Sequence, residues 1–190
     1  MGIKSISLTM LIVFSLFWGT QAQGRKVLLL KEIFIDTISI QNKISMIEKF
    51  GILKNERSWT ENHEDYSKTY SERTYDSVII QFFSIKNKVY IDWIKVVGSS
   101  HIISIRNTIL HVKDSIVKLR NVLPTITEDY YEYIKKNNKS SNVIIYFGFP
   151  LEIKTNTSPS ETYNGSLKFG IKNKVIEEIL IDFRSEGEYD

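Results

Sequence analysis

A heptapeptide occurs twice in this chain. Residues 83–89 are Phe-Ser-Ile-Lys-Asn-Lys-Val, and residues 169–175 are Phe-Gly-Ile-Lys-Asn-Lys-Val. In both copies apolar residues flank a Lys-Asn-Lys centre, and asparagine tolerates the left-handed backbone that tight turns need. The Phe and Ile of each copy also follow the two-residue period of a strand. Each copy therefore predicts a β-hairpin.

A second correspondence lies upstream of each hairpin, between residues 40–51 and 112–123. Asn42 and Asp114 stand where the N-cap of a helix belongs, and apolar residues then recur every three positions. Gly51 and Pro124 are residues that end helices. The unit is a short amphipathic helix followed by an antiparallel sheet, present twice. The predicted fold class is α+β, with two similar repeats, each a short helix packed on an antiparallel β-sheet.

The chain begins with the pattern of a signal peptide. Lys4 is followed by an apolar stretch over residues 8–18 and by a small-residue cleavage site ending at Ala22. This pattern predicts a signal peptide over 1–22, a first helix-plus-sheet repeat over 23–100 and a second over 101–190. The apolar stretch is too short to span a membrane comfortably, so we expect no transmembrane anchor after cleavage. We expect an exported protein, periplasmic or secreted.

Cysteine and charge narrow the possible classes. The chain has no cysteine, so it has no lipid-attachment cysteine, disulfide framework or thiolate site. Small exported domains of animals are usually rich in disulfides, which favours a bacterial protein. Loss of Lys4 with the signal peptide lowers the formal net charge from +3 to +2, and both signs are interspersed. This pattern does not indicate nucleic-acid binding.

Two stretches allow more than one interpretation. The strand predicted over residues 77–85 is apolar on both faces, so either another element covers its second face or that face binds a partner. Residues 55–75 are polar, with aromatic residues spaced along them, and fit either a strand followed by a loop or one long loop.

The sequence offers little for catalysis or metal binding. His63, His101 and His111 have no recurrent spacing to a serine or an aspartate, and a solvated or locally bonded imidazole is the simpler interpretation. The cluster at Glu61, His63, Glu64 and Asp65 has metal-binding residue types but matches no known ligand spacing, which favours a solvated loop. No phosphate-binding glycine loop is present. We predict no catalytic, cofactor-binding or metal site, and no cofactor.

Aromatic residues are numerous, and tyrosine and tryptophan often anchor interfaces. Sheets also use them for cross-strand packing; we favour packing for Trp93 and Tyr146 and leave both roles open in the two polar stretches. The candidate binding residues are Trp59, Tyr66, Tyr70, Tyr75, Tyr130, Tyr131 and Tyr133.

The capped segments at 42–51 and 114–124, together with the hairpins at 83–89 and 169–175, resemble the tandem repeats of the β-lactamase inhibitor protein family. They are also similar to the related small outer-membrane assembly lipoproteins. That resemblance implies sheets that form a shared, often concave surface for binding another protein. The inhibitors carry disulfides and the lipoproteins a lipidated cysteine, and this chain has neither. Inhibition of a β-lactamase is therefore not carried over.

Together these features predict an exported, non-catalytic binding protein that uses an aromatic sheet or loop surface. A protein partner is expected first and a polysaccharide second. The alternatives are a cell-envelope hydrolase with a carboxylate-based site, which requires a deep pocket with two carboxyl groups, and an immunity or inhibitor protein.

Overall fold

The computed structural model describes residues 28–40, 50–86, 88–137, 144–154 and 162–183. The fold is mostly β, with 55% of residues in strands and 18% in helices, and it has a single helix of seven or more residues among those described. The predicted α+β class, with two helix-on-sheet repeats, is therefore wrong. In the large sheet, apolar residues such as Val78, Ile80 and Phe82 alternate along the strand instead of following a helical period.

Eight strands form one large sheet in the order β1-β10-β11-β12-β7-β6-β5-β4. All neighbouring pairs are antiparallel except the parallel pair of β1 and β10. The strands are β1 Leu28–Leu29, β4 Asn55–Asn62, β5 Ser67–Thr74, β6 Val78–Ile85, β7 Lys88–Val96, β10 Ile145–Lys154, β11 Thr162–Lys172 and β12 Val175–Asp182.

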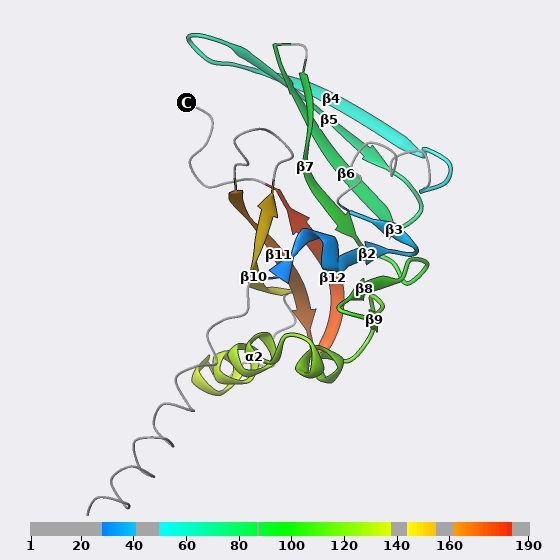
Figure 1. Cartoon of the computed structure of the whole chain (residues 1–190), viewed down its shortest axis with the longest axis vertical. Coiled ribbons are helices and arrows are strands. Elements are labelled where there is room, and N and C mark those ends of the chain that lie inside the picture. Colours follow the sequence, from blue (N-terminus) through cyan, green and yellow to red (C-terminus); the bar gives the residue numbers. More distant parts are fainter. Residues whose placement is uncertain (1–27, 41–49, 87, 138–143, 155–161, 184–190) are drawn as a thin grey trace, which may run out of the picture.

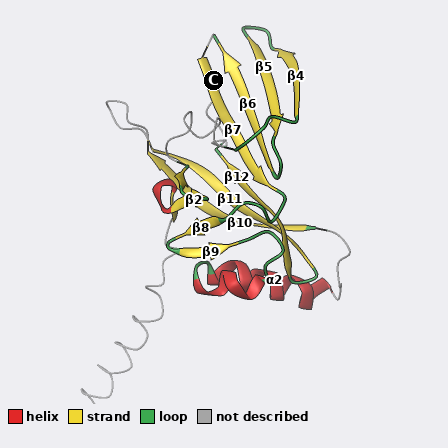
Figure 2. Cartoon of the chain, turned by 90° about the vertical axis from the view of Figure 1, so that its right-hand side faces the viewer, coloured by secondary structure: helices red, strands yellow, loops and turns green. Residues whose placement is uncertain are grey.

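A smaller sheet has four short strands in the order β3-β2-β8-β9. They are β2 Ile33–Ile35, β3 Ile38–Ser39, β8 Ile103–Ile105 and β9 Thr108–Leu110. The helical elements are the 3-10 helices η1 Leu30–Glu32 and η3 Ile116–Asn121 and the α-helix α2 Pro124–Asn137. In Figure 1 the strands β4 to β7 occupy one end of the molecule and α2 the other, and Figure 2 shows the same separation from the side.

One hydrophobic core joins these elements. The small sheet contributes Ile33 and Ile103, the large sheet contributes Ile94 and Ile181, and α2 contributes Ile126, all nearly or fully buried. The large sheet is continuous between the two halves of the chain, because β7 pairs with β12 over residues 93–96 and 179–182. The segments predicted as separate repeats thus share one sheet and one core.

Both predicted hairpins are confirmed. β6 and β7 form the first, and β11 and β12 form the second. In the second hairpin Lys172 pairs with Val175, and the two turn residues Asn173 and Lys174 both have positive φ, at 52° and 65°. This is the backbone of a type I′ turn, which matches the twist of the strands that it joins.

The identical Lys-Asn-Lys sequences turn at different residues. In the first hairpin Ile85 pairs with Lys88, so the turn lies one position earlier in the heptapeptide, and Lys86 has a φ of 49°. Asn87, the predicted left-handed residue of this turn, lies outside the described residues. Lys88 therefore begins a strand, whereas its equivalent Lys174 is a turn residue.

The second of the two helix predictions fails for a local reason. The first predicted helix, over 42–51, lies outside the described residues except for its end at 50–51. In the second, a 3-10 helix begins after Ser115, whose hydroxyl accepts the Val117 N–H, and the Asp114 carboxylate instead accepts the His111 N–H at 2.7 Å. Pro124, predicted to end a helix, begins α2. A proline fits the first helical position because its fixed φ is helical and that N–H has no partner within the helix.

Candidate binding surface

Four aromatic side chains form a row across neighbouring strands of the large sheet. The strand register aligns Trp59 of β4 with Tyr70 of β5, Tyr70 with Phe83 of β6, and Phe83 with Tyr90 of β7. Directly paired residues point to the same face of a sheet, so the four rings share one face. We call Trp59, Tyr70, Phe83 and Tyr90 the aromatic row.

The rings of the aromatic row stack on one another. Trp59 and Tyr70 have centroids 5.2 Å apart and planes 12° apart, and Phe83 and Tyr90 are 5.1 Å and 17° apart. The central pair, Tyr70 and Phe83, is tilted at 52° with centroids 6.4 Å apart. Rings lying side by side in one plane cannot come as close as the two stacked pairs do. These rings therefore overlap, and each covers part of a neighbour's face.

The aromatic row lies on the face opposite the core. Val78, Ile80 and Phe82 alternate with Phe83 along β6 and belong to the hydrophobic core, which does not include Phe83. Phe83 is nonetheless only 2% exposed, whereas Tyr90 is 45% exposed. The second apolar face predicted for residues 77–85 is thus covered at its centre by the aromatic row itself.

Cations border the aromatic row. The Lys68 ammonium lies 4.1 Å from the ring centroid of Phe83 and 4.9 Å from that of Tyr70, and the Lys68 side chain is buried. The Arg57 guanidinium lies 5.6 Å from the centroid of the Trp59 ring. Such contacts are attractive because the ring faces carry negative potential.

Glu72 fixes the position of Arg57. Two nitrogens of the guanidinium each lie 2.9 Å from a different oxygen of this carboxylate, in a bidentate arrangement. Hydrogen bonding to Glu72 is the main reason why the pKa of Arg57 is raised above its usual value. Arg57 thus stays charged and keeps its place beside the indole ring.

The turn that follows β4 holds another predicted residue. Tyr66 stacks on His63, with centroids 4.6 Å apart, and the His63 N–H donates to the Tyr66 carbonyl. The acidic cluster around His63 is therefore part of a closed turn. Among the described residues, no group of side chains could hold a metal ion.

The remaining candidate residues lie elsewhere. Tyr75 is 4% exposed and packs against Phe50 in the core, with ring centroids 6.2 Å apart. Tyr130 is 3% exposed, and its hydroxyl accepts the N–H of Lys174. Tyr131 and Tyr133 are exposed on α2, at the end of the molecule away from β4. Of the seven candidate binding residues, the structure thus brings only Trp59 and Tyr70 together in the aromatic row. Tyr66 lies in the adjoining turn.

Two members of the aromatic row, Phe83 and Tyr90, were not among the sequence candidates. Both belong to the first predicted hairpin. The sequence signal that could have identified them is their pairing across the turn, because residues 83 and 90 face each other once Ile85 pairs with Lys88.

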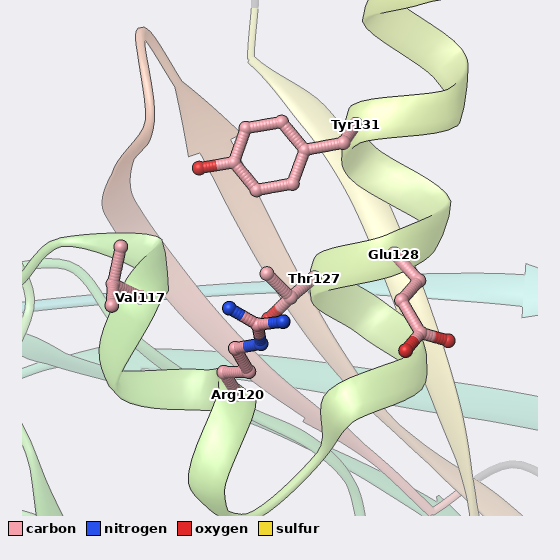
Figure 3. Close-up of a pocket in the computed structure, with 5 residues that line it drawn as sticks. All are labelled: Val117, Arg120, Thr127, Glu128 and Tyr131. Carbon is pink, nitrogen blue, oxygen red and sulfur yellow. The ribbon is translucent and has the colours of Figure 1, made fainter.

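A small pocket lies between η3 and α2, about 160 Å³ in volume and lined by Val117, Arg120, Thr127, Glu128 and Tyr131 (Figure 3). The Thr127 hydroxyl is buried there and has no hydrogen-bond partner in the described part of the chain. The pocket is smaller than typical small-molecule sites of about 300–1,000 Å³. Its lining has one carboxyl group, whereas the hydrolase alternative requires two.

The contact between His101 and Asp36 has a structural role. The His101 Nδ1 atom lies 2.8 Å from one Asp36 oxygen, and the other oxygen accepts the Ile102 N–H at 2.9 Å. Asp36 itself has a φ of 56° in the turn between β2 and β3. The carboxylate thus ties this turn to the segment that enters β8.

No protein-family model, curated protein or solved structure matches this chain. The resemblance drawn from the capped segments and hairpins stays a prediction. Within the ranges that the structure describes, no helix is both long and apolar enough to cross a membrane.

Proposed function

We propose that this chain is an exported, non-catalytic binding protein and that the aromatic row docks a protein partner. The observation that supports the proposal is the row itself, in which four strands place four aromatic rings on the face opposite the core. Tryptophan, tyrosine and arginine are the commonest anchors of protein interfaces. An immunity or inhibitor protein would be one member of this class.

The ring geometry favours a protein over a polysaccharide. Sugars stack on the open faces of aromatic rings, whereas the rings of the aromatic row cover one another at 5.1 to 5.2 Å. Lys68 covers a further part of Phe83. Tyr90 and the Arg57 side chain are exposed, and this combination of an aromatic ring and a guanidinium suits the mixed apolar and polar surface of a protein.

The test compares paired substitutions at the two ends of the molecule. The purified chain is used to capture partners from the cells that make it, and bound proteins are identified by mass spectrometry. Trp59→Ala with Tyr90→Ala removes the two outer rings of the aromatic row, while Tyr131→Ala with Tyr133→Ala removes two exposed tyrosines of α2 as a matched control. A partner held by the row loses about tenfold or more in affinity with the first pair and little with the second.

Phe83 is left unchanged in this experiment because it is buried, and its truncation would also affect folding. Circular dichroism and thermal unfolding establish that both double variants keep the native fold. Equal binding by the wild-type chain and the Trp59→Ala, Tyr90→Ala variant would overturn the proposal.

A further inference from the structure

β4 is an open edge of the large sheet. It pairs with β5 on one side, and the sheet order places no described strand on its other side. β4 has eight residues, whereas the opposite edge strand β1 has two and the edge strands of the small sheet have two and three. It contains no proline, and an edge of this length presents a row of free backbone donors and acceptors.

Hydrogen-bond alternation shows which residues of β4 point their backbone groups outward. The His63 N–H donates to the Tyr66 carbonyl, which continues the register in which Trp59 pairs with Tyr70. On the other side of β5, the Tyr75 N–H donates to the Val78 carbonyl. Residues of β5 with odd numbers therefore form their backbone hydrogen bonds with β6, and residues with even numbers form theirs with β4. Odd residues of β4 therefore bond inward, and Ser58 and Thr60 present free N–H and C=O groups at the edge.

The β4 sequence is complementary to itself in one antiparallel register. A two-fold axis at Trp59 opposes Ser58 to Thr60 of a second copy, and these are the residues whose backbone groups point outward. Trp59 then faces its own copy as a non-hydrogen-bonded pair, the kind in which opposed side chains come closest.

Charges agree with the same register. On the face of the aromatic row, Arg57 opposes Glu61 of the second copy, and the symmetry repeats this pair on the other side of Trp59. On the opposite face, Glu56 meets Asn62, so no like charges are opposed. A shift by one residue in either direction would break the alternation of backbone groups, and in one direction it would also oppose Glu56 to Glu61.

We propose that the protein forms a symmetric homodimer through antiparallel pairing of β4 with β4 of a second copy, centred on Trp59. The two large sheets become one continuous sheet, and the aromatic row continues across the two-fold axis into its copy. This edge interface uses backbone groups of β4 and does not depend on the partner of the aromatic row.

The first test blocks the edge without touching the aromatic row. Thr60→Pro removes an outward N–H, and its side chain lies on the other face from Trp59. Thr60→Val is the matched control, because it keeps the N–H and the β-branched shape. Analytical ultracentrifugation over a concentration series is expected to give twice the monomer mass for the wild type and for Thr60→Val, with the dimer dissociation constant raised at least about tenfold by Thr60→Pro.

A second test determines the register and does not require the proline variant to fold. The chain has no cysteine, so a single introduced cysteine can form a disulfide only with the same cysteine of a second copy. The rate of cross-linking then shows how close the two copies of that residue lie. Trp59→Cys places the thiol on the two-fold axis, within reach of its copy, whereas Ser58→Cys and Thr60→Cys place it off the axis. Disulfide-linked dimers should form fastest with Trp59→Cys.

Three results would overturn the proposal. They are a monomer at all concentrations, a wild-type dimer that persists unchanged in Thr60→Pro, and faster cross-linking at position 58 or 60 than at 59. A dimer of correct register that binds no partner would count against the proposed function alone, so the two proposals are separable.

Discussion

Lys174→Gly is expected to stabilise the protein, although replacing lysine by glycine lowers stability in most helices and strands. Lys174 has a φ of 65° in the turn between β11 and β12. A left-handed conformation costs about 1–2 kcal/mol for a residue with a Cβ atom and little for glycine. Loss of the weak contact between the Lys174 ammonium and the Tyr131 ring, 6.0 Å away, offsets about 0.5 kcal/mol. The net expected gain in the free energy of unfolding is about 0.5–1.5 kcal/mol.

The same substitution in the other heptapeptide should have the opposite sign. Lys88 begins β7 and pairs with Ile85, and it is not among the residues with positive φ. Glycine in a strand loses more conformational freedom on folding, so Lys88→Gly should lower the free energy of unfolding by about 0.5–1 kcal/mol. The two lysines have identical neighbours on both sides, Asn before and Val after, so the chain contains its own control.

Urea unfolding followed by circular dichroism measures both variants against the wild type. Thermal unfolding adds an independent measure, with a shift of about 2–4 °C expected per kcal/mol for a chain of this size. Shifts of the same sign in the two variants would show that the two turns have the same register, and would refute the reasoning.

Three further changes test the interior and its charges. Tyr130→Phe should lower the free energy of unfolding by about 1–2 kcal/mol, measured in urea, because the Lys174 N–H loses its buried acceptor. Thr127→Val should raise it by about 1 kcal/mol, while Thr127→Ser should not, because only valine removes the unpartnered hydroxyl. Burial of Glu32 raises its pKa, but the hydrogen bonds that it accepts, chiefly from Arg106, hold the pKa below its usual value. The Glu32 carboxylate therefore stabilises the fold above the ordinary glutamate pKa of 4.5 and loses this contribution as pH falls through the lower folded pKa, so Glu32→Gln should flatten the acid side of the stability profile.

The hairpins could be predicted because their information is local. A turn sequence and the alternation of its flanking residues lie within about ten positions of one another, and both reflect the same backbone geometry. The place of the turn within Lys-Asn-Lys could not be predicted from that segment. The two copies have the same residues there, and yet the last strand pair before the turn is Ile85 with Lys88 in the first copy and Lys172 with Val175 in the second.

The one long helix was missed although its sequence contains a signal. Ile126, Tyr130 and Ile134 recur every four residues along α2, and all three pack in or against the core. This spacing is the apolar stripe of a helix. Pro124 hides this signal, because proline commonly follows the end of a helix but also fits the first position of one.

The aromatic row shows a different limit. Trp59 and Tyr70 were candidates by residue type, but their contact with each other and with Phe83 requires the register of three strand pairs. That register depends on which apolar residues reach the core, and a shift of one residue would move every side chain to the other face. Residue type thus indicates which side chains are suited to binding, whereas only the sheet determines which of them form one surface.

The two hairpins also differ in where their strand pairing changes register, and the second one changes register beside the one position at which the heptapeptides differ. Ser84 of the first copy corresponds to Gly170 of the second, and the second hairpin changes register between Gly170 and Ile171, with Glu177 as the extra residue of β12. A Cβ atom at position 170 would lie 2.6 Å from the Glu178 Cγ atom and 2.8 Å from the Ile144 Cγ2 atom, too close for any side chain unless both neighbours moved. The first hairpin changes register earlier, between Gln81 and Phe82, outside the heptapeptide. Glycine at position 170 thus permits the close approach of Glu178 beside a bulge that lies within the second heptapeptide, whereas the first hairpin has its bulge outside the heptapeptide.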